Sequence, residues 1–336
     1  MRRCSSRKCS RATQSDVAAY RWCELVIRAD FEIPELERAG PGTAGDEWRV
    51  SMLSGAPAER PQREWFHQWE LPDGRKWVAF ARDAGGYLLR FPDLADFDIV
   101  PAARTIGIYT RPPTPAHTLR HLLLDQVMPL VAGVPDRLAL HGSAVATARG
   151  AVLFLAGPGF GKSTLAALLA RRGCELVSDD CCLLARAAAG FEVVPSYPGV
   201  RLGTDSLREV FGETSQDYAQ VAHYTMKMRV AGEQQAELLL HQGRLPLSRI
   251  YVIASRAELE AASAVSIQRY TRRAALFDLL NYTFHLDVGD PARIRDAFHL
   301  AADIAMRHDV RRLVFPWGLS KSEAVAEAIL GDRWNA

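Results

Sequence analysis

The segment that most constrains the fold is 151–164, AVLFLAGPGFGKST. Its first six residues, 151–156, are all apolar and have the length and content of a buried strand. A glycine-rich turn follows, and then residues 161–164 open a helical pattern that closes on basic residues and glycine at 171–173. A buried strand, a tight turn and a helix in this order predict an α/β core.

The turn in this segment has the composition of a phosphate-binding loop. Glycines allow backbone N–H groups to converge on an anion, and the helix N-terminus adds partial positive charge. We expect Lys162 to reach the outer phosphates of a nucleotide and the Ser163 hydroxyl to hold Mg²⁺. The first position of the pattern is Ala156 instead of glycine. The residues predicted to bind the nucleotide are Gly157, Pro158, Gly159, Phe160, Gly161, Lys162, Ser163 and Thr164.

An acidic pair, Asp179-Asp180, follows the apolar run ELVS after the predicted helix. A helix of about 11 residues rises about 16 Å, and a returning strand covers that distance in about five residues. The pair is therefore expected beside the glycine turn. There one carboxylate can take a metal-water position, and the other can accept a hydroxyl proton as the γ-phosphate is attacked. The alternative is an ordinary Asp-Asp at a strand-to-turn junction.

Other polar residues are weaker candidates. His141 ends the strand DRLAL, 21 residues before Lys162, and a lone histidine is more often structural than catalytic. A basic residue must also balance the charge on a moving phosphoryl group, and our order of preference is Lys227, Arg229, Arg244. Solvated surface charge is the commoner explanation for each of these three.

Composition limits the partners and the compartment. The chain has 336 residues, 48% of them hydrophobic, which is enough for a full core and two domains. A net charge of +2 gives no reason to expect a nucleic-acid partner. No apolar stretch approaches the roughly 18–20 residues of a membrane helix. Cys181 and Cys182 lie in an apolar strand, and Cys4 and Cys9 lack zinc spacing, so we expect a reducing cytoplasm.

The pattern along the chain divides it into three parts. Residues 1–15 form a basic tail, 16–115 alternate short β-like runs with turns, and 116–336 mix strands with helices. The middle part predicts a small antiparallel β domain. The last part predicts a phosphate-loop α/β domain with a mixed sheet. Helices are expected near 116–132, 271–283 and 291–308, with a last one starting at Ser320 and Glu323 in capping-box position.

The strings LHGSAV and VLFLAGPGFGKSTLAALLARRGCELVSDD resemble the core of the HPr kinase/phosphatase family over residues 138–184. The resemblance implies the fold of that family, the HPr kinase/PEP carboxykinase type. It also implies that Lys162 and Ser163 bind phosphate and Mg²⁺, that Asp180 accepts the proton of the target serine, and that His141 assists. Family enzymes assemble into oligomers, so a homo-oligomer is compatible with it.

A second resemblance narrows the first. The segment from Ser196 to Ser206, with PLSRIYVI and VRRLVFPWGLSK, resembles a divergent branch of that family found with lasso-peptide biosynthesis. This chain departs from the bifunctional enzymes in its N-terminal half. Their glycine-rich signature is replaced by YPGVRLGTDS, so HPr is not the expected substrate.

Together these features favour a kinase that uses ATP and Mg²⁺ to phosphorylate a serine of a peptide or small protein, such as the C-terminal serine of a lasso precursor. In this hypothesis Asp180 is the base, Lys162 the phosphate clamp, Ser163 and Asp179 the metal side, and His141 the helper. Two alternatives stay open: a non-catalytic ATP-binding partner of a peptide-biosynthesis complex, and a small-metabolite kinase. The sequence contains no Asn-Lys-x-Asp string, which argues against a GTPase. Lys162 argues against dinucleotide binding, whose fingerprint has a third glycine and no lysine.

Overall fold

The computed structural model describes residues 17–60, 62–71, 73–133, 136–212, 215–231, 238–318 and 322–332. The basic tail predicted for 1–15 and the helix start predicted at Ser320 lie outside these ranges. The described chain is a mixed α/β structure with two eight-stranded sheets and one small sheet. Of the described helices, none combines the length and apolarity needed to cross a membrane.

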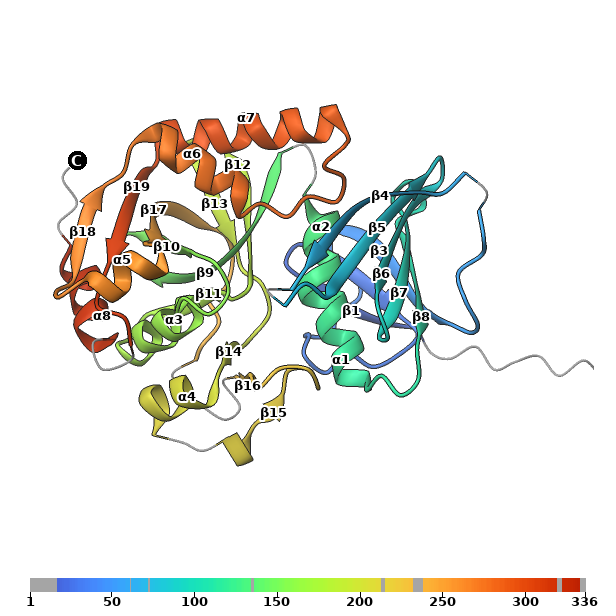
Figure 1. Ribbon diagram of the computed structural model, residues 1–336, viewed down its shortest axis with the longest axis horizontal. Coiled ribbons are helices and arrows are strands. Elements are labelled where there is room, and N and C mark those ends of the chain that lie inside the picture. The colour runs from blue at the N-terminus through green and yellow to red at the C-terminus, as the bar shows by residue number, and fades with distance from the viewer. Residues whose placement is uncertain are drawn as a thin grey trace, which may run out of the picture.

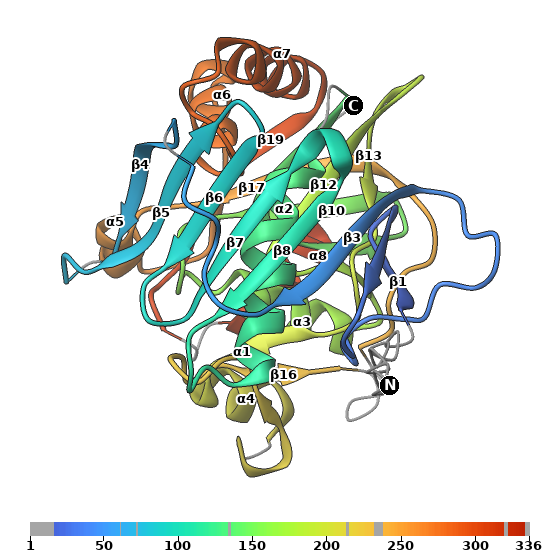
Figure 2. The ribbon, with the colours of Figure 1, turned by 90° about the vertical axis from the view of Figure 1, so that its right-hand side faces the viewer.

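The first sheet has the strand order β1-β2-β3-β8-β7-β6-β5-β4 (Figure 2). Its strands are β1 (Ala18–Trp22), β2 (Leu25–Ala29), β3 (Asp46–Leu53), β4 (Glu64–Glu70), β5 (Lys76–Asp83), β6 (Gly86–Phe91), β7 (Ala95–Val100) and β8 (Thr105–Thr110). A short 3₁₀ turn, Pro101–Ala103, precedes β8.

The expectation of a purely antiparallel first sheet is wrong. β3 pairs in parallel with both β2 and β8. Two features of the chain explain the parallel pairing: the length of the connection between β2 and β3, and the path by which β8 returns to β3. The chain between β2 and β3 is long enough to cross over, and β4 to β8 form an antiparallel meander that comes back beside β3.

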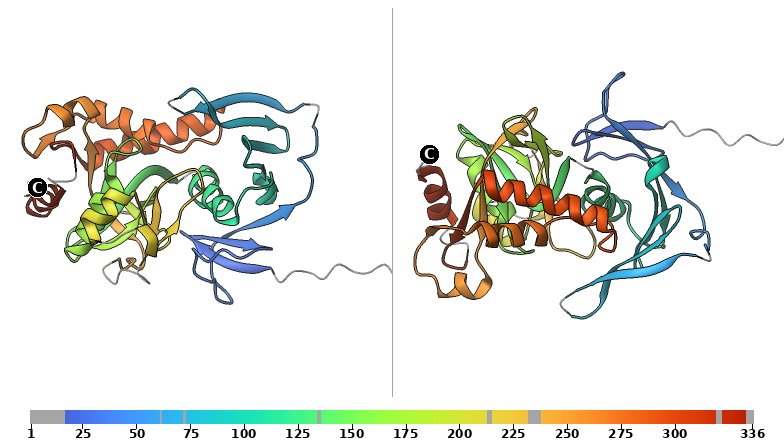
Figure 3. Two further views of the ribbon diagram at one scale, coloured as in Figure 1. Left: turned by 60° about the horizontal axis from the view of Figure 1, so that its bottom comes forward. Right: turned by 90° about the horizontal axis from the view of Figure 1, so that it is seen from above.

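The helix expected near 116–132 is present in three continuous pieces: α1 (Ala116–His121), a π-helical segment (Leu122–Val127) and α2 (Met128–Ala132). It lies between the first sheet and the rest of the molecule, and the sheet curves around it (Figures 1 and 3). Its apolar face shares one core with Trp22, Phe97 and also Leu183 of the second sheet. The predicted domain boundary at 115 lies immediately before a helix that packs on both sheets.

The second sheet has the order β10-β9-β12-β13-β17-β19-β18, and β10 also pairs with β17. Its strands are β9 (Arg137–Thr147), β10 (Gly150–Leu155), β11 (Glu175–Ser178, paired to β9), β12 (Cys181–Ala187), β13 (Gly190–Val194), β17 (Leu245–Ile253), β18 (Ser266–Arg269) and β19 (Asp309–Val314). β10, β17 and β19 run parallel, whereas β9 runs antiparallel to β10.

Helices cover both faces of this sheet (Figure 1). The helices are α3 (Lys162–Arg171), α4 (Thr204–Phe211), α5 (Arg256–Ala261), α6 (Arg272–Asn281), α7 (Pro291–Arg307) and α8 (Ser322–Gly331). α3 and α8 contribute to one apolar core, and α6 and α7 contribute to another on the opposite face. The helices predicted near 271–283 and 291–308 are confirmed. A small sheet of β14 (Val200–Leu202), β16 (Met228–Val230) and β15 (Ala219–Gln220), with a 3₁₀ turn at Ser215–Asp217, lies beside α4.

Candidate active site

The glycine turn joins β10 directly to α3, as the sequence predicts. We call residues 156–161 the glycine loop. Gly159 and Gly161 have φ angles of +82° and +87°, a region that side-chain-bearing residues rarely adopt. Gly161 is the N-cap of α3, so the loop turns sharply and leads into the first helical N–H groups. A glycine loop that leads into a helix N-terminus is the arrangement in which backbone N–H groups can bind an anion.

We expect Gly161→Ala to lower the free energy of unfolding by about 1–2 kcal/mol, the cost of a left-handed alanine. A Cβ at this position meets nothing within 4 Å, so the cost is conformational rather than steric. Gly133→Ala is the matched control, because Gly133 has φ −68° and equally open space. Urea denaturation of the two variants checks this, and equal losses would contradict it.

Lys162, the first residue of α3, folds back under the glycine loop. Its Nζ donates to the carbonyl oxygens of Ala156 at 2.8 Å and Gly157 at 3.0 Å, and lies 3.1 Å from His141 Nε2. Burial lowers the pKa of Lys162 to about 8, although the carboxylates of the acidic pair oppose this. The ammonium group is thus held at the loop in a partly dehydrated setting.

His141 is held as a neutral ring between Lys162 and the acidic pair. Its Nδ1 lies 3.1 Å from the carbonyl oxygen of Asp180, which can only accept, so Nδ1 carries the proton and Nε2 accepts from Lys162. Burial and the charge of Lys162 lower the pKa of His141 to about 4. This arrangement orients the lysine and fixes the spacing between the glycine loop and Asp180.

The acidic pair forms the tight turn between β11 and β12, with Asp180 at φ +65°. The Asp180 carboxylate lines the same cleft as the glycine loop. Burial raises the pKa of Asp180, but Arg201 and Lys227 outweigh burial and hold the pKa well below its usual range. Arg201 Nε lies 3.3 Å from Asp180 Oδ2. Asp180 is therefore a carboxylate that stays ionised.

The Asp179 carboxylate, predicted on the metal side, points away from the cleft. Its Oδ1 accepts from the Ser143 hydroxyl at 2.5 Å and its Oδ2 accepts from the Arg201 backbone N–H at 2.9 Å. Burial and the neighbouring Asp180 raise its pKa. In this conformation Asp179 braces the turn that presents Asp180.

A buried charge cluster behind the acidic pair was not predicted from the sequence. Arg201 on β14 bonds Asp125 Oδ1 at 2.9 Å, and Tyr197 donates to the same Asp125 oxygen. His121 Nδ1 lies 2.7 Å from the other oxygen of Asp125. Asp125 belongs to the π-helical segment, so the long helix at 116–132 supplies a counter-charge to the site. The one available signal was an arginine between Val200 and Leu202, in an otherwise apolar strand.

The cleft over the glycine loop has a volume of about 450 Å³. His141, Lys162, Asp180 and Lys227 all line it. So do the remaining predicted loop residues except Gly157, namely Pro158, Gly159, Phe160, Gly161, Ser163 and Thr164. The other two basic candidates point elsewhere: Arg229 bonds the carbonyls of Glu35 and Pro198, and Arg244 pairs with Glu24.

A magnesium ion at this cleft would depend on more than protein carboxylates. Among the residues that the structure describes, no group of three His, Cys, Asp or Glu side chains is placed to hold a metal. Mg²⁺ commonly takes one or two protein oxygens together with substrate phosphates and waters. The Ser163 hydroxyl lines the cleft and can supply one such oxygen, whereas Asp179, the other predicted metal residue, does not line it.

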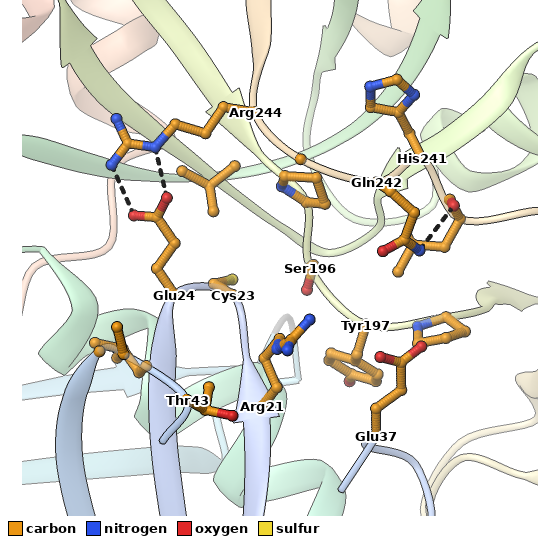
Figure 4. Close-up of a pocket in the computed structure, with 18 of the residues that line it drawn as sticks. Arg21, Cys23, Glu24, Glu37, Thr43, Ser196, Tyr197, His241, Gln242 and Arg244 are labelled. Carbon is orange, nitrogen blue, oxygen red and sulfur yellow. Dashed lines mark hydrogen bonds and ion pairs between the residues drawn. The ribbon is translucent and has the colours of Figure 1, made fainter. Parts of the chain in front are cut away.

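A larger cavity of about 710 Å³ lies between β1–β2 and the segments 194–198 and 240–244 (Figure 4). Three of its charged side chains pair with one another: Glu24 binds Arg244 at 2.5 and 2.9 Å and Arg137 at 3.3 Å. Neither the glycine loop nor the acidic pair lines it. The chemistry that the sequence predicts therefore belongs to the smaller cleft.

Comparisons with known proteins give limited information. No protein-family model matches the chain, and no curated protein matches it. A solved structure that resembles it is the HPr(Ser) kinase/phosphatase from Coxiella burnetii. The match has a TM-score of 0.30 and 10% sequence identity, and it covers 57% of this chain and 87% of that chain. A similarity this low assigns no activity, so a functional conclusion has to come from the cleft itself.

Proposed function

We propose that the chain is a kinase that transfers the γ-phosphoryl group of ATP, with Mg²⁺, to the hydroxyl of a serine in a peptide or small protein. One observation carries the proposal: Lys162, His141 and Asp180 meet in the cleft where a glycine loop enters a helix. These groups supply a phosphate clamp and a proton acceptor within one site.

In the proposed reaction the serine oxygen forms a bond to the γ-phosphorus while the bond from that phosphorus to the ADP oxygen breaks. Asp180 orients the serine hydroxyl and takes its proton as the new bond forms. Lys162 and the loop N–H groups stabilise the phosphate charge, and Lys227 faces the same space. A bound Mg²⁺ would neutralise charge on the β- and γ-phosphates.

The ion pair between Arg201 and Asp180 favours a second candidate, a non-catalytic ATP-binding partner of a peptide-biosynthesis complex. A carboxylate paired with a buried guanidinium is a weak base, because a general base works best with a pKa near the working pH. Such a partner would bind ATP through Lys162 and need no proton transfer at Asp180.

Mass spectrometry distinguishes the candidates. The protein is incubated with ATP, Mg²⁺ and a peptide ending in serine, such as a lasso precursor, and in parallel with the same peptide ending in alanine and with free serine. The proposal predicts one added phosphate on the serine peptide alone, and none with Lys162→Ala. ATP binding without transfer to any acceptor would favour the binding partner, and transfer to free serine would favour a metabolite kinase.

The affinity of the free protein for ATP should fall as the pH rises from about 7 to about 9. The pKa of Lys162 is lowered to about 8, so its ammonium group is protonated below that pH and lost above it. Lys162→Arg is the control, since a guanidinium stays protonated throughout. Calorimetric titration at several pH values checks this, and a flat profile for the wild type would contradict it.

A further inference from the structure

Several strands end at the same edge of the second sheet, and their order fixes the two sides of the glycine loop. Cys181 of β12 pairs with His141 of β9, Gly142 of β9 pairs with Leu155 of β10, and Leu155 pairs with Val252 of β17. Ile253 of β17 then pairs with Leu313 of β19. The order along this edge is therefore β12, β9, β10, β17, β19, with the glycine loop in the middle.

The two sides differ in chemistry. The β9 and β12 side carries His141 and Asp180, whereas the chain beyond β19 carries Phe315 and Trp317. Both sides line the same cleft. Two strand spacings of about 4.8 Å separate β10 from β19, so the aromatic side lies about 10 Å from the loop strand. A nucleotide whose γ-phosphate faces Asp180 can extend its other end toward Trp317, because both residues line the cleft.

An aromatic pair lies at the β19 side of the cleft. The rings of Phe160 and Trp317 are 5.9 Å apart and nearly perpendicular, at 80°. Arg256 stacks on Trp317 with 3.6 Å between its guanidinium carbon and the ring centroid, which holds the indole in place. Trp317 is still 36% exposed. Phe160 is itself part of the glycine loop, and a Cβ on Gly157 would lie 3.3 Å from its ring.

We propose that Phe160 and Trp317 form the subsite for the nucleobase. This rests on the proposed function, since it assumes that a nucleotide occupies the loop. A flat base has a π-face that stacks on aromatic side chains, and an indole fixed by a cation on one side is pre-organised for such contact. The polar end of the cleft then holds phosphates and the acceptor serine, and the aromatic end holds the base.

The test compares ATP with inorganic tripolyphosphate, which has the phosphates but no base. Calorimetry with Mg²⁺ is run on the wild type, on Trp317→Ala and on Trp65→Ala, a control for loss of an exposed tryptophan on β4 of the first sheet. Trp317→Ala should weaken ATP binding about 5- to 150-fold, equivalent to 1–3 kcal/mol. Its tripolyphosphate binding should equal that of the wild type, and Trp65→Ala should change neither. Trp317→Phe keeps an aromatic ring, so its loss of ATP affinity should be smaller than that of Trp317→Ala.

Four results bear on the inference in different ways. If both Trp317 variants lose affinity for ATP and for tripolyphosphate equally, the inference is overturned, because Trp317 would then support the loop rather than bind the base. A raised KM for the peptide with unchanged ATP binding would also overturn it and assign the aromatic pair to the acceptor. If the wild type binds neither ligand, both proposals fail. If the predicted ATP-specific loss occurs without phosphate transfer, the base subsite stands and the kinase proposal fails.

Discussion

Asp180→Asn is expected to reduce phosphate transfer to the serine peptide by about 10²–10⁴-fold, the usual contribution of a positioned proton acceptor. The affinity for ATP should stay within a small factor of the wild type, because Lys162 and the glycine loop remain. Asparagine accepts the left-handed backbone that Asp180 adopts at φ +65° and is nearly isosteric, so the fold should be retained.

Single-turnover transfer and ATP titration, measured on the same samples, check this prediction. Asp93→Asn is a matched control, because Asp93 is an exposed turn residue of the first sheet with φ +60° and lies outside the cleft. It should transfer phosphate at the wild-type rate. A wild-type rate in Asp180→Asn would remove the proton acceptor from the mechanism and favour the non-catalytic binding protein.

Arg201→Met is expected to lower the free energy of unfolding by about 3–5 kcal/mol at neutral pH, the cost of leaving a buried charge without its partner. Arg201 contacts Asp125, Asp179 and Asp180, and its guanidinium is almost wholly buried. In the folded wild type the pKa values of Asp125 and Asp180 are lowered, so their stabilising contribution is present above about pH 4 and disappears as the pH falls. The difference in the free energy of unfolding between Arg201→Met and the wild type should therefore become smaller at acidic pH.

Urea denaturation at neutral and acidic pH measures that difference. Arg208→Met is the control, since Arg208 is an exposed arginine on α4 and its loss should cost less than about 0.5 kcal/mol. Adding Asp125→Leu to Arg201→Met removes one of the stranded carboxylates and should recover part of the stability. A loss that is equal at all pH values would show that Arg201 acts through packing rather than charge.

The elements around the glycine loop were predictable because they depend on local patterns. The apolar run before Gly157 and the leucine spacing after Lys162 specify a strand and a helix without help from the rest of the chain. The return of Asp180 to the loop followed from helix rise and strand length. The geometry places it there, with His141 between it and Lys162.

The remaining features depend on contacts between distant segments. Alternating apolar residues in β3 predict a strand, but they do not encode that β2 and β8 flank it in parallel. Both Asp179 and Asp180 are expected beside the glycine loop from their sequence position. Only the bond from Ser143, 36 residues away, shows that Asp179 braces the turn while Asp180 lines the cleft. Asp125 lies 76 residues from Arg201, so no motif could connect them.

The shared core around the helix at 116–132 has a consequence for how the proposed acceptor peptide would enter. A clamshell motion that separated the two sheets would pull Asp125 from Arg201 and wet a buried charge in every cycle. The proposed acceptor peptide would instead enter at the mouth of the cleft, where Met226 beside Lys227 is 70% exposed.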